Sequence, residues 1–216
     1  MQILHPFSGL IQDYSKWEGK CEGPKSCALC GSKRALKAHG FYSRTAVDVD
    51  WEGVIWIPRF LCRACRRTIS LLPGCLLPYW RFTIRVMASF LNARLGEGQP
   101  LKASAEAAHQ PEASYQRGQH WVRRFTCQAE TLSASLASIA RPPVAAPSFV
   151  AKALTMLNEA GWVQAHRFLF GQVHAHLLGW PRWLAPAGLG VRLRRAVGSG
   201  AGPVQSTCVD GPDPPA

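Results

Sequence analysis

Two pairs of cysteines have the spacing expected of a tetrahedral metal site. Cys27 and Cys30 form one C-x2-C pair, and Cys62 and Cys65 form a second pair after 31 intervening residues. Two such hooks can place four thiolates around one zinc ion at about 2.3 Å. Gly31 follows the first hook, where a residue without a Cβ atom lets a backbone N–H group approach sulfur. We therefore predict one structural Zn²⁺ ion bound by the four thiolates, in a closed site that folds the chain and does not catalyse.

Other uses of the cysteines fit the sequence less well. A disulfide framework is typical of secreted chains, and the first residues, Met1–Pro6, do not resemble an export signal. A redox C-x-x-C pair belongs on the strand-to-helix turn of a βαβ unit, whereas the surrounding residues here resemble hairpins. Cys21 and His39 are alternative ligands, although four thiolates already fill a tetrahedral shell.

The residues around the two hooks predict a small zinc ribbon over residues 21–75. Alternating and β-branched residues indicate two or three antiparallel strands at Leu36–Val49, Val54–Leu61 and Arg67–Leu72. Pro58 within the second of them indicates an edge position or a bulge. Such a ribbon is too small to be stable without its metal.

The charge of the chain favours a polyanionic partner. The sequence has 25 Lys+Arg against 13 Asp+Glu, a formal net charge of +12, and attraction to nucleic acid is the usual consequence. The window from Gly53 to Gly96 contains no acidic residue and is the strongest local bias. Its basic residues are all arginines, which bind phosphates and guanine edges in a bidentate manner: Arg59, Arg63, Arg66, Arg67, Arg81, Arg85 and Arg94.

A mainly helical region follows over residues 79–130. Apolar periodicity predicts helices at Tyr79–Leu95, Leu101–Ala108 and Tyr115–Glu130, with Ser114 as the N-cap of the last one. Helix, short helix, turn and helix is the order of a helix-turn-helix, whose last helix lies in the major groove. A plain three-helix bundle without DNA-binding use is the alternative.

The last helix of this region carries side chains of the kinds that contact DNA. Arg117, Gln119 and His120 lie near its N-terminal half, where we expect base edges to be read. Arg123 and Arg124 are expected to hold phosphates. Six arginines of the basic window complete the predicted nucleic-acid contacts: Arg59, Arg63, Arg66, Arg67, Arg81 and Arg85.

Several motifs in order resemble the N-terminal zinc ribbon of bacterial insertion-sequence transposases. They are the first hook with Gly31, His39-Gly-x-Tyr-x-Arg44, Arg59-Phe-x-Cys-x-x-Cys-Arg-Arg-Thr68, and Leu-Leu-Pro73 with Arg81-Phe-Thr83. Trp121-Val-Arg-Arg-Phe125 resembles the end of the helix-turn-helix in those proteins, and the order as a whole resembles an uncharacterised bacterial family of short transposase-like proteins. The resemblance covers about residues 15–130. The resemblance implies binding to the ends of a mobile DNA element, and a zinc ion bound by the four hook cysteines. The sequence departs from the family pattern at Arg66, because a glycine often follows the second hook.

A complete transposase is excluded by the acidic residues. Strand transfer in that group uses three carboxylates around two metal ions. After Glu130 the sequence contains only Glu159, Asp210 and Asp213. We therefore expect a non-catalytic protein.

The last third of the chain is expected to form an appendage. Residues 140–148 are a proline-rich linker, Phe149–Ala160 and Val163–Leu178 are two helices of a hairpin over 149–184, and 185–216 are a disordered tail. His166, His174 and His176 are expected to have packing or surface roles, since two of them are only two residues apart and face different sides of a helix.

Together these observations predict an α+β protein: an N-terminal segment of residues 1–20, a zinc ribbon, a helix-turn-helix region and a C-terminal helical hairpin. The expected function is zinc-dependent binding of double-stranded DNA in the cytoplasm, as an accessory, remnant or regulator related to transposases. RNA or ribosome binding through exposed ribbon aromatics such as Trp56 or Phe60 is one alternative. A zinc-stapled protein-interaction module is another. We expect no membrane partner, because about 18 uninterrupted apolar residues are lacking, and a homo-oligomer could form through the C-terminal helices.

Overall fold

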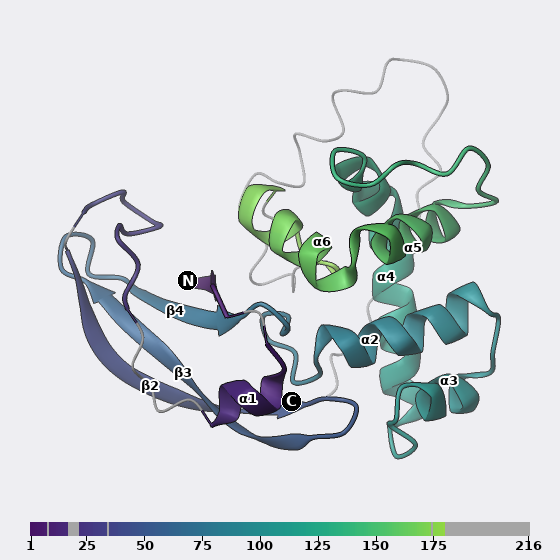
Figure 1. Ribbon diagram of the computed structural model, residues 1–216, viewed down its shortest axis with the longest axis horizontal. Helices are drawn as coiled ribbons and strands as arrows, with labels where there is room; N and C mark the ends of the chain where they lie inside the picture. Colours follow the sequence, from purple (N-terminus) through teal and green to yellow (C-terminus); the bar gives the residue numbers. More distant parts are fainter. Residues whose placement is uncertain (8, 17–21, 34, 174, 180–216) are drawn as a thin grey trace.

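The computed structural model describes residues 1–7, 9–16, 22–33, 35–173 and 175–179 as an α+β protein. A four-stranded sheet lies on one side and the longer helices lie on the other (Figure 1). The strands are ordered β1-β4-β3-β2. Their bounds are β1 Gln2–His5, β2 Leu36–Val47, β3 Glu52–Cys62 and β4 Thr68–Pro73.

The three strands predicted around the hooks are present and antiparallel, but the sheet is mixed. β3 pairs with β2 on one side and with β4 on the other. β1 adds a fourth strand parallel to β4, with Gln2 opposite Ser70. Pro58 lies in the central strand β3 and not at an edge, and its partner Phe41 is where the register shifts. The predicted bulge at Pro58 is therefore confirmed, and the predicted edge position is wrong.

One face of the sheet is covered by a short helix, α1 (Ile11–Ser15). Ile11 and Tyr14 of this helix are buried against Ile55 and Ile57 of β3. On the opposite face of the same strand, Trp56 remains 57% exposed. Alternation along a strand sends successive side chains to opposite faces, so the first half of β3, up to Trp56, has one buried and one open face.

The helices of the central region lie close to their predicted positions. They are α2 Ile84–Leu91, the π-helical turn η1 Asn92–Gly96, α3 Leu101–Ala107 and α4 Tyr115–Leu136. The predicted cap Ser114 is confirmed, because its side chain accepts a hydrogen bond of 3.3 Å from the Arg117 backbone N–H. α2 begins five residues later than the prediction because Thr83 caps it and Phe82 pairs with Val47 of β2.

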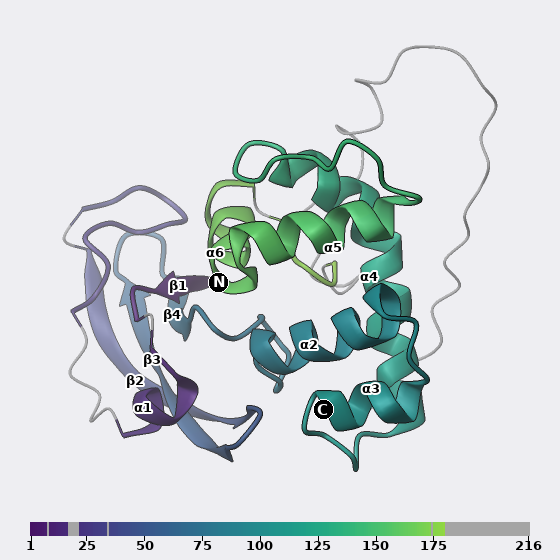
Figure 2. The same cartoon turned by 45° about the vertical axis from the view of Figure 1, so that its right-hand side comes forward.

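The C-terminal helices belong to the same core as α2–α4. α5 (Phe149–Ala160) has the predicted bounds, whereas α6 (Trp162–Phe168) is followed by the π-helical turn η2 (Leu169–Val173) and does not reach Leu178. Buried residues of α5 and α6 pack with Trp121 and Phe125 of α4 in the larger hydrophobic core. Figure 2 shows α5 and α6 against α2 and α4. The end of the predicted hairpin and the tail at 185–216 lie outside the described residues.

Two half-buried arginines join the sheet to the helical part. Arg44 of β2 donates to the backbone carbonyls of Leu77 and Trp80, in the segment that leads into α2. Arg167 of α6 donates to the carbonyl of Phe7, and its guanidinium lies against Gly74, where a Cβ atom would come within 2.7 Å of Nε. The helical part is therefore fixed to the sheet segment by charge-assisted hydrogen bonds at β2 and just after β1. None of the described helices is long and apolar enough to span a bilayer.

Candidate metal centre and basic surfaces

The structure brings the four predicted metal ligands together at one end of the sheet. The Sγ atoms of Cys27 and Cys65 are 3.8 Å apart, as are those of Cys30 and Cys62, and all four lie within 4.8 Å of one another. A tetrahedral zinc site with bonds of about 2.3 Å has an edge of about 3.8 Å between sulfurs. The separations therefore fit a tetrahedral metal ion. His39 is not in this group among the described residues.

The two hooks have the same backbone geometry. In the first, Gly31 N–H donates to Cys27 C=O at 2.8 Å and Cys27 N–H donates to Ser32 C=O at 3.0 Å. In the second, Arg66 N–H donates to Cys62 C=O at 2.8 Å, and Cys62 N–H donates to the carbonyl of Arg67 at 2.9 Å. In each hook, the residue after the second cysteine has a left-handed backbone conformation, with φ of 71° at Gly31 and 56° at Arg66. Arginine therefore replaces glycine in the second hook without a change of turn.

Backbone amides in the first hook favour a thiolate. The Leu29 N–H donates to Cys27 Sγ at 3.4 Å. Desolvation acts to raise the pKa of Cys27, but hydrogen bonds from the backbone of Cys30 and Leu29 and from neighbouring thiols outweigh it and lower the pKa to about 6. A thiolate is the form of cysteine that binds metal.

Few apolar side chains hold this end of the sheet. Its buried cluster consists of Cys27, Cys62 and Ile69, with partly buried neighbours such as Ile3 and Leu36. So small a cluster buries too little apolar surface to order two loops and three strand ends. A bound metal ion would supply the missing stabilisation.

Basic residues flank the second cysteine hook in the chain. Arg63, Arg66 and Arg67 are exposed and Arg59 is half-buried. None of these four forms an ion pair with a carboxylate of the described residues. We call Arg59, Arg63, Arg66 and Arg67 the metal-end surface.

A second set of basic and aromatic side chains lies where α4 begins. The guanidinium groups of Arg81 and Arg117 both lie on the Phe82 ring, 4.9 Å and 5.2 Å from its centroid. The rings of Trp80 and His120 are 5.4 Å apart, and Arg123 is exposed one turn further along α4. Burial and the charge of Arg81 lower the pKa of Arg117. We call Arg81, Arg117, His120 and Arg123 the α4 surface.

Other predicted contacts are engaged within the chain. Arg85 forms ion pairs with Asp48 at 3.6 Å and Asp50 at 3.1 Å. Arg124 donates to the carbonyls of Leu178 and Gly179 at 2.8 and 2.9 Å. Gln119 is half-buried on α4. The two arginines therefore hold the fold together. The exposed members of the metal-end and α4 surfaces are Arg63, Arg66, Arg67, Arg81 and Arg123.

Sequence reasoning missed Arg44 and Trp80 as organisers of the α4 surface. Arg44 fixes the carbonyl of Trp80, the residue that precedes Arg81, and Trp80 contacts His120. The signal was present, because Arg44 lies in the resembling motif and Trp80 directly precedes Arg81. The contact between Arg44 and Trp80 joins residues 36 positions apart in the chain, and sequence periodicity does not reveal such contacts.

The C-terminal histidines have the predicted packing role where they are described. His166 and His176 are fully buried, and burial followed by neighbouring positive charge lowers the pKa of His166 to about 3 and that of His176 to about 4. His176 Nδ1 accepts from the Leu178 N–H at 3.1 Å. His174 lies outside the described residues.

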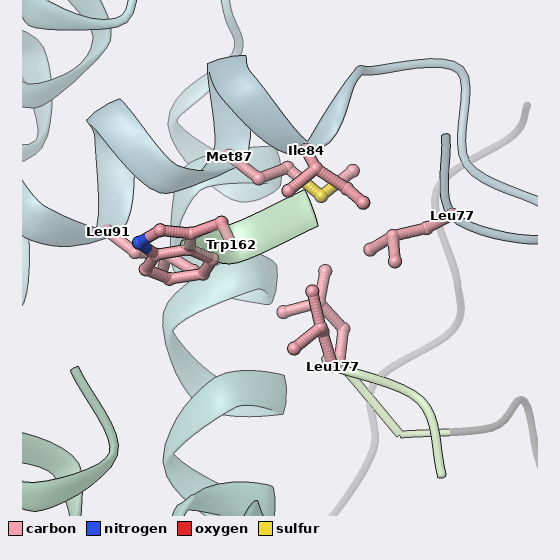
Figure 3. Close-up of a pocket in the computed structure, with 7 residues that line it drawn as sticks. Leu77, Ile84, Met87, Leu91, Trp162 and Leu177 are labelled. Carbon is pink, nitrogen blue, oxygen red and sulfur yellow. The ribbon is translucent and has the colours of Figure 1, made fainter. Parts of the chain in front are cut away.

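An apolar pocket lies between α2, α6 and the segment at 177–178 (Figure 3). Ile84, Met87, Trp162 and Leu177 are among the residues that line it, and it is too narrow for a water molecule. Figure 3 shows these side chains pointing toward one another. It is a packing seam of the helical core, without polar groups that could orient a ligand.

These features define a class of protein: an α+β chain with a small mixed sheet, several helices and four clustered cysteines compatible with a metal ion. A family model described as a domain of unknown function (DUF6431) matches residues 27–110. The matched segment begins at the first hook and ends after α3, so it includes all four cysteines and stops short of α4. No curated protein and no solved structure matches the chain.

Proposed function

We propose that the protein is a zinc-dependent DNA-binding protein in which α2, α3 and α4 act as a helix-turn-helix. In this account the four cysteines hold one structural Zn²⁺ ion, α4 lies in the major groove, and the chain does not catalyse. The single observation that carries the DNA assignment is the α4 surface, where half-buried Arg117 and His120 and exposed Arg123 gather on the N-terminal half of α4 beside exposed Arg81.

The donor set is the argument for zinc. Four thiolates with near-tetrahedral separations suit Zn²⁺ or an iron–sulfur centre, whereas carboxylate-preferring ions such as Mg²⁺ and Ca²⁺ do not bind sulfur well. The cluster offers one sulfur per ligand position, and the Cys27–Cys65 and Cys30–Cys62 edges of 3.8 Å fit a single ion. Zinc bound there would be coordinatively closed, so its role would be to order the hooks and not to activate water.

The arrangement of the helices supports the major-groove assignment. The backbone turns left-handed at His109, two residues after the end of α3, with φ 57°, and Ser114 caps the start of α4. Trp121 of α4 packs between Phe82 and Phe90 at centroid distances of 5.0 and 5.1 Å, which holds α4 against α2. The opposite side of the first turns of α4 remains available to DNA, with Tyr115 65% exposed.

A competition assay with two single variants and a control tests this proposal. Arg117→Ala is expected to weaken binding to a selected duplex sequence more than binding to random duplex, by about 1–3 kcal/mol at the affected base. Arg63→Ala is expected to weaken both alike, because a phosphate contact carries no base information. Arg141→Ala, an exposed arginine between α4 and α5, is the matched control. Equal losses for Arg117→Ala on both DNAs would contradict the assignment.

The biological setting follows from the resemblance to transposases. Without a carboxylate triad the protein would act in the cytoplasm as an accessory, remnant or regulator related to a mobile element. The buried faces of α5 and α6 pack inside the chain, so a homo-oligomer would use their outer faces, where Phe149 is 53% exposed.

Single-stranded RNA is the second candidate partner, on the open face of the sheet. Trp56 and Phe41 are 57% and 47% exposed there, and aromatic rings on a sheet stack with unpaired bases. Phe60, the other expected stacking residue, is only 6% exposed, so that part of the expectation is wrong. If single-stranded RNA is the partner, Trp56→Ala would abolish RNA binding. If duplex DNA is the partner, Trp56→Ala would leave duplex binding unchanged.

A further inference from the structure

We propose that one molecule contacts a DNA duplex at two places about one helical turn apart, with the α4 surface at one and the metal-end surface at the other. This inference rests on the proposed function and adds to it the span of the site. A chain that binds through α4 alone would cover a single groove segment. Four features of the structure point to the second contact.

The first is that the arginines of the metal-end surface have no carboxylate partner among the described residues. Arg63, Arg66 and Arg67 are exposed, and none forms an ion pair with a described carboxylate. Arg66 and Arg67 extend directly from the second hook, whose backbone hydrogen bonds fix their position. Arginines held by a rigid turn lose less conformational freedom when they bind phosphate than arginines on a mobile segment do.

The second is that charge is separated along the sheet. Residues 23–47 and 53–96 contain no acidic side chain, so the acids of this region are confined to the turn between β2 and β3, as Asp48, Asp50 and Glu52. Arg85 and His109 lie on two of these carboxylates. The metal end is therefore basic and the opposite end of the same strands is neutralised, which leaves a field that attracts phosphate at the metal end.

The third feature is the length of β3, from the turn at Glu52 to the hook at Cys62. Val47 pairs with Glu52 at the turn, and its backbone N–H also bonds the carbonyl of Arg81, so the α4 surface begins there. Cys62 lies ten residues further along β3, which corresponds to about 33 Å at about 3.3 Å per residue. One turn of B-form DNA measures about 34–36 Å. The two ends of β3 are therefore about one helical turn of DNA apart, the separation that the proposed contacts at neighbouring turns require.

The fourth is the shape of the molecule. Figure 1 shows the sheet extending away from α2–α5, with the strand ends that carry the hooks on the side away from these helices. Arg44 and Arg167 fix the near end of this arm to the helical part. The two surfaces are therefore held at a set separation and are not joined by a flexible linker.

Hydroxyl-radical footprinting of the zinc-loaded full chain on a 40-base-pair duplex tests the proposal. We expect two protected patches centred about one helical turn apart. The triple variant Arg63→Gln, Arg66→Gln, Arg67→Gln is expected to lose one patch and keep the other. Its log–log salt dependence of binding should be shallower by about 2.7, the value for three phosphate contacts at about 0.9 each.

Controls separate this inference from the proposed function. The variant Lys16→Gln, Arg141→Gln, Lys152→Gln removes the same charge elsewhere and should keep both patches. Zinc content of one ion per chain in the triple variant shows that its hooks are intact. A single patch in the wild type, or two patches unchanged in the arginine triple variant, would overturn the two-point contact and leave the DNA-binding proposal standing. Failure of the zinc-loaded wild type to bind duplex would overturn both.

Discussion

Gly31 and Arg66 occupy the same position in two matched turns, each directly after the second cysteine of its hook and each with a left-handed backbone. An L residue with a side chain costs about 1–2 kcal/mol there relative to glycine. We therefore expect Arg66→Gly to be more stable than Arg66→Gln by about 1 kcal/mol, because both remove the charge and only glycine relieves the backbone. Chemical denaturation of the zinc-loaded variants measures this, with Gly31→Ala expected to shift in the opposite direction. Equal stabilities of Arg66→Gly and Arg66→Gln would show that the turn is not strained.

Removing the metal is expected to unfold one end of the molecule only. The cluster at the metal end contains three buried residues, whereas α2, α4 and α5 share the larger core. After chelation, amide hydrogen exchange should become fast at Cys27 and Cys62 and stay slow at Trp121 and Phe125. The same pattern is expected for Cys62→Ser. Protection that is unchanged at both hooks after chelation would mean that metal does not hold the ribbon.

Acid is expected to destabilise the helical part through two buried histidines. Burial, followed by neighbouring positive charge, lowers the pKa of His166 to about 3 and of His176 to about 4, below the value of 6.5 for the unfolded chain. As the pH falls below 6.5, the unfolded chain takes up protons that the folded chain does not, so stability is present above pH 6.5 and is lost as pH approaches 4. The loss is about 2 kcal/mol per histidine between pH 7 and pH 5.

The double variant His166→Leu, His176→Gln isolates this effect. Its free energy of unfolding should change less than that of the wild type between pH 7 and pH 5, by up to about 4 kcal/mol. Proton-driven loss of metal acts on both proteins alike and cancels in the comparison. Parallel pH profiles for the two proteins would show that the histidines do not carry the acid sensitivity.

Arg44 is expected to matter for both stability and DNA binding. Burial lowers the pKa of its guanidinium, and its hydrogen bonds satisfy the carbonyls of Leu77 and Trp80. Arg44→Met should cost about 2–3 kcal/mol because buried carbonyls lose a charged donor. Because Trp80 contacts His120, duplex affinity should also fall. A variant with full stability would contradict the role assigned to this side chain.

The local features of the fold were predictable from the sequence. The C-x2-C spacing identified the four clustered cysteines, Ser114 was identified as a cap, and α5 has the predicted bounds Phe149–Ala160. The predicted end of α4 at Glu130 was wrong, because Leu132 and Leu136 continue its buried spacing and the helix runs to Leu136.

Features that depend on distant contacts were not predictable in the same way. β1 is a strand only because β4 offers it a parallel edge, and its four residues carry no period of their own. α2 begins at Ile84 because Thr83, whose hydroxyl donates to Asp48 at 2.7 Å, caps it. Arg85 was assigned to nucleic acid on composition, and its two carboxylate partners lie 35 and 37 positions away in the chain.

The central claim is zinc-dependent binding of duplex DNA, and fluorescence anisotropy tests it most directly. Zinc-loaded full-length protein would be titrated into labelled duplex DNA, single-stranded DNA and RNA of one sequence pool at about 150 mM salt, the physiological ionic strength, with and without a chelator. The account predicts tighter binding to duplex than to either single strand, and loss of much of that binding after chelation. Equal or tighter binding to the single strands, or no binding to any of the three, would contradict it.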